Sequence, residues 1–122
     1  MRGFGWGCAA AAIMLTAGCA AGLAGFGVPP LTVLEAPCGA QTDYGADAPA
    51  VYSAFLDAYV AYRHGRIVKA DYCSFQASIS QQHAALVSGG PGARPAWAVF
   101  FNDARVKAIN WRAAVDPSLR GG

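Results

Sequence analysis

Apolar residues recur at helical spacing in three stretches between residues 47 and 117, and each stretch predicts one helix. The first begins at Asp47-Ala48-Pro49, which combines an acidic residue near the cap with proline in the first turn. It runs to about His64 and ends at Gly65, a residue type that commonly follows the last helical residue. Its apolar residues cover one half of the helix surface: Val51, Tyr52, Phe55, Leu56, Tyr59, Val60 and Tyr62.

The second predicted helix extends from about Asp71 to Val87 and ends before Gly89-Gly90. Residues 66–70, which precede it, are a candidate short strand, but Ile67-Val68 is too brief to distinguish a strand from a loop. The apolar stripe of this helix consists of Tyr72, Phe75, Ile79 and Leu86, and the same arc includes His83, which we expect to be packed and hydrogen-bonded.

The third predicted helix is opened by Pro95 and closed by Pro117. A continuous apolar seam follows alternating spacings of four and three residues: Trp97, Phe101, Ala104, Ala108, Trp111 and Val115. The opposite side has a second stripe, formed by Val99, Val106 and Ala113 and flanked by Ile109. A helix that is apolar on two sides lies either in the centre of a bundle or against a partner.

Three helices in this length predict an all-α fold, a small three-helix domain over residues 47–117 followed by a disordered tail, residues 118–122. Residues 20–46 are rich in Gly and Ala, contain Pro29, Pro30 and Pro37, and have neither a helical nor a strand period. We therefore expect a flexible tether before the domain.

The amino-terminal segment has the pattern of an export signal, since no charged residue lies between Arg2 and Glu35. Arg2 supplies the basic start, and an apolar stretch from Cys8 to Thr16 follows. Leu15-Thr16-Ala17-Gly18-Cys19 resembles the lipobox of bacterial lipoproteins, in which small residues precede an obligatory cysteine. The family favours Leu three residues before that cysteine, whereas this chain has Thr16 there.

The resemblance implies that residues 1–18 are removed as a signal peptide and that residues 19–46 form the lipid anchor and tether. In that family the cysteine, here Cys19, receives diacylglycerol on sulfur and an acyl chain on its freed amine. Ala20 follows it in place of the Asp that retains many lipoproteins at the inner membrane, so the resemblance implies the periplasmic face of the outer membrane. Two alternatives remain open: cleavage after Ala20 or Ala24, which gives a soluble periplasmic protein, and an uncleaved membrane anchor.

Four cysteines are present, and removing Cys8 with the signal and assigning Cys19 to lipid leaves Cys38 and Cys73. A remaining pair in an oxidising compartment predicts a disulfide between them. Closing a loop of this length contributes roughly 3–4 kcal/mol in the chain-entropy model, which would support a small core. The alternative is a free reactive thiol at Cys73.

Charge argues against nucleic-acid binding, because the net charge is +2 and only 13% of residues are charged. Such binding requires a clustered basic stripe. In this chain the basic residues after the signal are spread singly: Arg63, Arg66, Lys69, Arg94, Arg105, Lys107, Arg112 and Arg120.

No catalytic residue, metal site or cofactor is expected. Ser53, Asp57 and His64 have the residue types of a hydrolase triad, but Asp57 and His64 are about 10 Å apart along one helix. Cys73 and His83 are ten residues apart on one predicted helix and cannot touch. With two histidines in the chain, a zinc site would need both of them together with further ligands.

Aromatic residues are numerous for so small an interior, and they are enriched at interfaces. They are Tyr52, Phe55, Tyr59, Tyr62, Tyr72, Phe75, Trp97, Phe100, Phe101 and Trp111. The candidate partner surface consists of Tyr59, Tyr62, Val99, Val106 and Trp111, with filling of the core as the alternative role of the aromatics. These features predict a lipid-anchored envelope accessory protein that binds another envelope protein without catalysis. The alternative is a small periplasmic enzyme or inhibitor that acts on the cell wall or its hydrolases.

Overall fold

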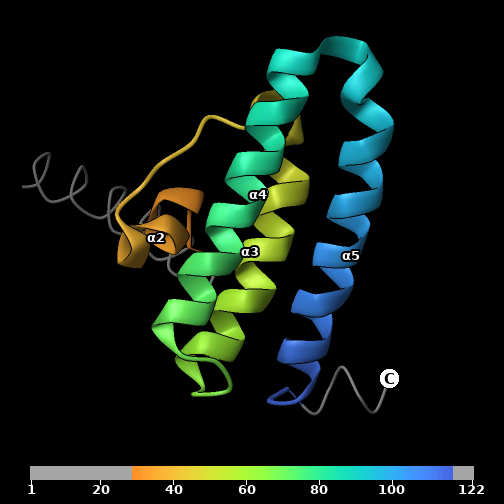
Figure 1. Ribbon diagram of the computed structural model, residues 1–122. Helices are drawn as coiled ribbons and strands as arrows, with labels where there is room; N and C mark the ends of the chain where they lie inside the picture. The colour runs from red at the N-terminus through yellow and green to blue at the C-terminus, as the bar shows by residue number, and fades with distance from the viewer. Residues whose placement is uncertain (1–28, 117–122) are drawn as a thin grey trace, which may run out of the picture. The chain divides into compact units, whose positions relative to one another are not determined.

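The computed structural model describes residues 29–116, and all regular elements in this range are helices (Figure 1). A short helix, α2 (Leu31–Glu35), precedes three long ones: α3 (Ala48–Arg63), α4 (Lys69–Gly89) and α5 (Arg94–Ala113). Single 3₁₀ turns lie at Ala36–Cys38, Gly45–Asp47 and Gly90–Ala93. The predicted all-α, three-helix fold is therefore confirmed, and it belongs to the unit that begins at Leu31.

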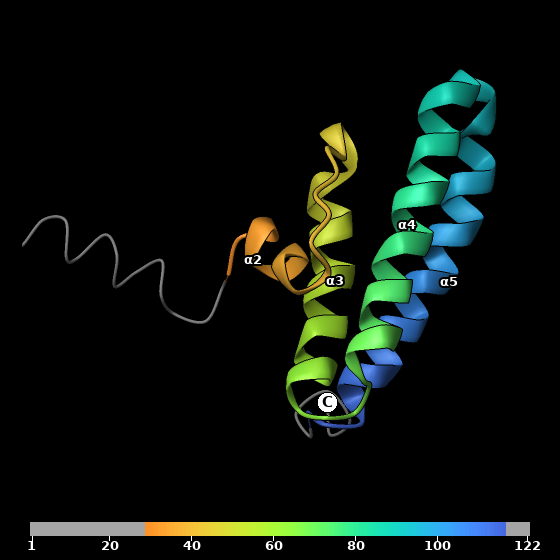
Figure 2. The ribbon, with the colours of Figure 1, turned by 60° about the vertical axis from the view of Figure 1, so that its left-hand side comes forward.

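The three long helices pack side by side around one apolar core (Figures 1 and 2). The contact between α3 and α5 is the most extensive in the bundle. Small side chains allow these two helices to approach, since the buried residues include Ala54, Ala58 and Ala61 on α3 and Ala104 and Ala108 on α5. Larger buried side chains such as Phe55, Trp97 and Phe101 fill the rest of the core.

The helix ends follow the local sequence. Gly65 has a φ of +78°, which favours glycine, and it follows the last residues of α3 as predicted. The stretch 66–70 contains no strand; the amide of Arg66 donates to the carbonyl of Ala61, and α4 begins at Lys69. At its other end α4 continues past Val87 to Gly89, beyond the expected end.

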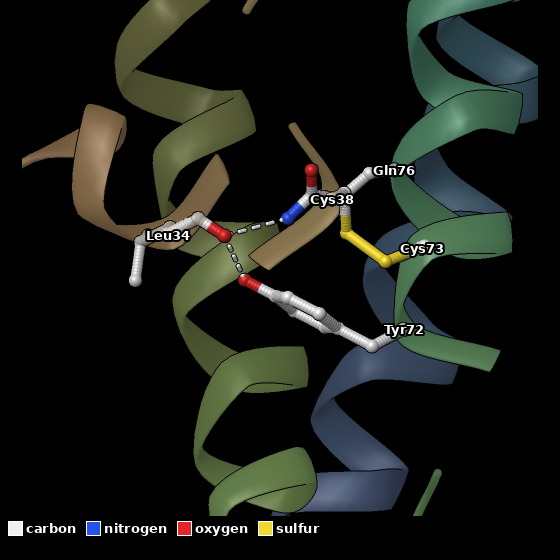
Figure 3. Close-up of a disulfide and its surroundings, with 5 residues drawn as sticks. All are labelled: Leu34, Cys38, Tyr72, Cys73 and Gln76. Atoms are coloured by element: carbon white, nitrogen blue, oxygen red, sulfur yellow. Dashed lines mark hydrogen bonds between the residues drawn. A yellow bond between two sulfur atoms is a disulfide. The ribbon is translucent and has the colours of Figure 1, made fainter. Parts of the chain in front are cut away.

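The folded unit begins well before residue 47, which corrects the expectation that residues 31–46 belong to a tether. Leu34 of α2 is fully buried, and Tyr44 is 2% exposed. The carbonyl of Leu34 accepts hydrogen bonds from the hydroxyl of Tyr72 and from Nε2 of Gln76, the latter at 2.8 Å (Figure 3). The five residues of α2 are too few to display a helical period, so these tertiary contacts, rather than local pattern, hold the segment.

The predicted disulfide is present between Cys38 and Cys73, whose Cα atoms are 5.4 Å apart (Figure 3). It joins the turn after α2 to the first half of α4. The segment from Leu31 to Cys38 is thus fixed to the bundle both by a covalent bond and by the two hydrogen bonds at Leu34.

Candidate functional site

The side of α5 that faces away from the core exposes several apolar residues. Trp97, Phe101, Ala104 and Ala108 are buried and form the inner side of the helix, as the sequence predicted. On the opposite side Val99, Val106 and Ile109 are 68%, 50% and 40% exposed. We call this side the outer seam, and it consists of Pro95, Val99, Asn102, Val106, Ile109 and Ala113.

Two opposite charges flank the outer seam. Asp103 and Arg105 lie about 80° to either side of it, because successive residues of a helix are about 100° apart. Neither forms an ion pair with another of the described residues. Nε of Arg105 is buried and has no hydrogen-bond partner in residues 29–116. The seam therefore has an acidic flank and a basic flank whose charges are not neutralised within the domain.

A groove of about 690 Å³ lies between α4 and α5. Phe75, Phe100 and Trp111 supply much of its apolar lining. The ring of Trp111 packs edge-on against Phe75 at 5.4 Å, and Nζ of Lys107 lies 5.3 Å from the centre of the Trp111 ring. Trp111 is thus half-buried within the domain.

Tyr59 and Tyr62 of α3 are also half-buried, and they belong to a cluster of three tyrosines. The ring of Tyr62 stacks on that of Tyr72 at 5.0 Å, and the ring of Tyr59 lies 6.0 Å from Tyr72. The five residues of the candidate partner surface therefore lie in different parts of the domain, although Val106 and Trp111 both line the α4–α5 groove. Val99 and Val106 are on the outer seam, Trp111 is in the α4–α5 groove, and the two tyrosines pack beside Tyr72.

Asp47, His83 and Arg94 form a polar cluster beside a hollow of about 770 Å³. One oxygen of Asp47 accepts a hydrogen bond from Arg94 at 2.9 Å, and the other lies 3.3 Å from Nε2 of His83. The hydrogen bond from Arg94 lowers the pKa of Asp47, and the charge of Arg94 and the contact with His83 act in the same direction. Asp47 makes no side-chain cap at α3, so its role is to join the turn before α3 to α4 and α5.

The buried imidazole of His83 lies between the rings of Tyr44 at 5.0 Å and Trp97 at 5.3 Å. This placement agrees with the expectation of a packed histidine. The sequence pattern missed its carboxylate partner, because Asp47 and His83 are brought together only by the packing of two separate elements.

Glu35 is a buried carboxylate that belongs to no recognisable sequence motif. It is 3% exposed and accepts a hydrogen bond from the backbone amide of Thr42 at 3.2 Å. Burial raises the pKa of Glu35, and the amide of Thr42 partly opposes that change. It shares a hollow of about 330 Å³ with the hydroxyls of Thr42 and Ser80, which are 3.0 Å apart. Glu35 therefore holds the loop that follows the disulfide. The one feature of the sequence that could have drawn attention to Glu35 is that it is the first charged residue after Arg2.

The residues of the discounted triad are engaged elsewhere. Oδ1 of Asp57 accepts a hydrogen bond from Arg112 at 2.9 Å, the hydroxyl of Ser53 donates to the carbonyl of Pro49, and His64 is exposed. The pairing of Asp57 with Arg112 of α5 depends on the packing of two separate helices, which the spacing within one helix does not reveal. The Cys73 sulfur is bonded to Cys38, so the structure excludes a free thiol at that position.

Within residues 29–116, no three side chains of the metal-binding types come together as a metal site. No helix in the same range has the length and apolar character needed to cross a bilayer. Cys19 lies outside the described residues. Comparison of the chain with protein-family models, with curated proteins and with solved structures found no match.

Proposed function

We propose that this chain is a lipid-anchored accessory protein of the bacterial envelope that binds an envelope protein through the outer seam of α5. The anchor is Cys19, on the strength of the lipobox-like Leu15-Thr16-Ala17-Gly18-Cys19. The location that goes with it is the periplasmic face of the outer membrane, and cleavage after Ala20 or Ala24 would instead give a soluble periplasmic protein.

The exposure of the outer seam is the observation that carries this proposal. Val99, Val106 and Ile109 lie in one row on a helix whose other side already forms the core. Single exposed apolar residues are ordinary, but a row of them along one helix is typical of a surface that another helix or protein covers. The disulfide between Cys38 and Cys73 supports an extracytoplasmic location, because such bonds persist in oxidising compartments.

Photo-crosslinking in intact envelopes tests the proposal. A photoreactive side chain replaces Val106 on the outer seam, and in a matched chain it replaces Gln82, which is exposed on α4. We expect an adduct with a protein at position 106 and not at position 82. Equal labelling at both positions, or no adduct at position 106, would contradict the proposal.

The same preparations test the anchor. Intact-mass analysis of the membrane fraction is expected to show a chain that begins at Cys19 and bears acyl groups, whereas Cys19→Ser is expected to lose membrane association. An acyl-free chain that begins downstream of Cys19 would refute the anchor while leaving the binding surface open to the crosslinking test.

A further inference from the structure

The outer seam has the spacing of a two-helix interface. From Pro95 to Ala113 its members are separated by four, three, four, three and four residues. Alternation of three and four is the pattern by which one helix packs along another. Val99 and Val106 occupy one set of equivalent positions in this repeat, and Asn102 and Ile109 occupy the other set. The pattern therefore indicates a helix as the occupant.

Asn102 indicates which helix occupies the outer seam. It is the one hydrogen-bonding side chain in the seam and lies between Val99 and Val106. In a parallel pair of identical helices each seam residue faces its own copy, so the Asn102 amide meets another amide, which can both donate and accept. An apolar helix laid on the seam would leave that amide unpaired.

The flanking charges support the same arrangement. Around a two-fold axis parallel to α5, the Asp103 flank of one copy faces the Arg105 flank of the other. Two symmetric pairs of opposite charges then form from residues that have no ion-pair partner within residues 29–116. An antiparallel pair would place Asp103 beside Asp103 and Arg105 beside Arg105, which is unfavourable.

We propose that the outer seam of α5 binds the outer seam of a second copy of this chain, in parallel, to form a two-fold symmetric dimer. The proposal rests on the function proposed above and names the partner of the same surface. A two-fold axis along α5 places Leu31 of both copies at the same height.

The length of the outer seam determines how strongly we expect two copies to associate. From Pro95 to Ala113 it spans about 27 Å, which is short for a stable dimer. Confinement of two anchored chains to one membrane raises their effective concentration. We therefore expect dimers in membranes and detergent micelles rich in protein, and weaker association at high dilution.

Cysteine crosslinking of the full-length membrane-bound protein tests the arrangement. Val99→Cys and Val106→Cys are each expected to form a disulfide-linked dimer on mild oxidation, while Gln82→Cys on α4 is not. In an antiparallel pair position 99 would instead face position 109, so a mixture of Val99→Cys and Ile109→Cys chains would crosslink and Val99→Cys alone would not. That result would overturn the parallel arrangement.

A charge exchange provides the control. Asp103→Arg is expected to weaken the dimer by about tenfold, since it removes two ion pairs and places like charges together. Asp103→Arg with Arg105→Asp exchanges the flanks and is expected to restore crosslinking at position 99. Circular-dichroism melting of each variant establishes that the fold is kept. Failure of the double variant to recover, with an unchanged melt, would contradict the pairing.

The two proposals fail in different ways. A homodimer-sized adduct at positions 99 and 106 supports both. An adduct at position 106 with a different protein, together with no crosslink between copies, overturns the dimer and leaves the proposed binding function in place. No adduct of either kind overturns both.

Discussion

The carboxylates of Glu35 and Asp47 lie in opposite electrostatic environments. Glu35 is buried and has no basic side chain in ion-pair range among the described residues, so its pKa is raised. Asp47 contacts Arg94 and His83, so its pKa is lowered. The two residues therefore make the stability of the fold depend on pH with opposite signs.

Replacing Glu35 tests this difference. A raised pKa in the folded protein means that stability is fully present below the ordinary carboxyl value of about 4.3 and is lost as pH rises through the folded pKa. We expect Glu35→Gln to keep the hydrogen bond from Thr42 and to lose this pH dependence, so its free energy of unfolding falls less than that of the parent between pH 4 and pH 7. Urea unfolding of both chains at several pH values measures this difference in the free energy of unfolding.

Asp47→Asn is the matched control. The stabilisation that the Asp47 carboxylate provides is present above the ordinary carboxyl pKa and is lost as pH falls through the lowered pKa of Asp47. The variant is therefore expected to lose most stability near neutral pH and least in acid. A Glu35→Gln chain whose pH profile matches that of the parent would contradict the assignment of the buried carboxylate.

At the scale of the helices, the close approach of α3 and α5 depends on alanines. Ala108 of α5 is fully buried. Ala108→Leu adds volume that the packed interior cannot accommodate, and we expect a loss of about 1–3 kcal/mol in the free energy of unfolding. Ala84→Leu on the exposed side of α4 is the control, with an expected change near zero. A change of equal size in both variants would argue against a tight α3–α5 contact.

The three long helices were predictable because each has enough residues to repeat its apolar spacing and is bounded by proline or glycine. The disulfide was predictable because assigning Cys8 to the signal peptide and Cys19 to the lipid left one pair of cysteines. The same spacing placed Val99 and Val106 on a second apolar side of the third helix but left open whether other helices or a partner cover it, and the structure shows both residues exposed.

What the sequence did not reveal depends on tertiary contacts. The five residues of α2 show no period, and their position is fixed by hydrogen bonds from Tyr72 and Gln76, about forty residues later. The half-burial of Tyr59, Tyr62 and Trp111 likewise depends on the angle at which α3, α4 and α5 pack. Local spacing places a side chain on a helix face but does not say which neighbour covers it.

On the scale of the whole molecule, one covalent bond closes a long loop around α3. Cys38 and Cys73 are 35 residues apart. Replacing both with alanine is expected to lower the free energy of unfolding by about 3–4 kcal/mol in the chain-entropy model. Small domains are marginally stable, so this loss would be a large share of the total free energy of unfolding.

Urea unfolding with and without reductant measures the effect. The parent chain is expected to show a lower midpoint after reduction, and the Cys38→Ala/Cys73→Ala chain is expected to be insensitive to reductant. Equal midpoints for the oxidised and reduced parent would contradict a stabilising role for the bond.

The position of that bond also determines how mechanical tension travels. If the chain is held by lipid at Cys19 and by a partner on α5, a pull between these points passes from Cys38 directly to Cys73 and onward along α4. Residues 39–72, with the whole of α3, lie in a closed loop beside that covalent route. Stretching the tethered protein therefore cannot lengthen it by unravelling α3 until the sulfurs are reduced.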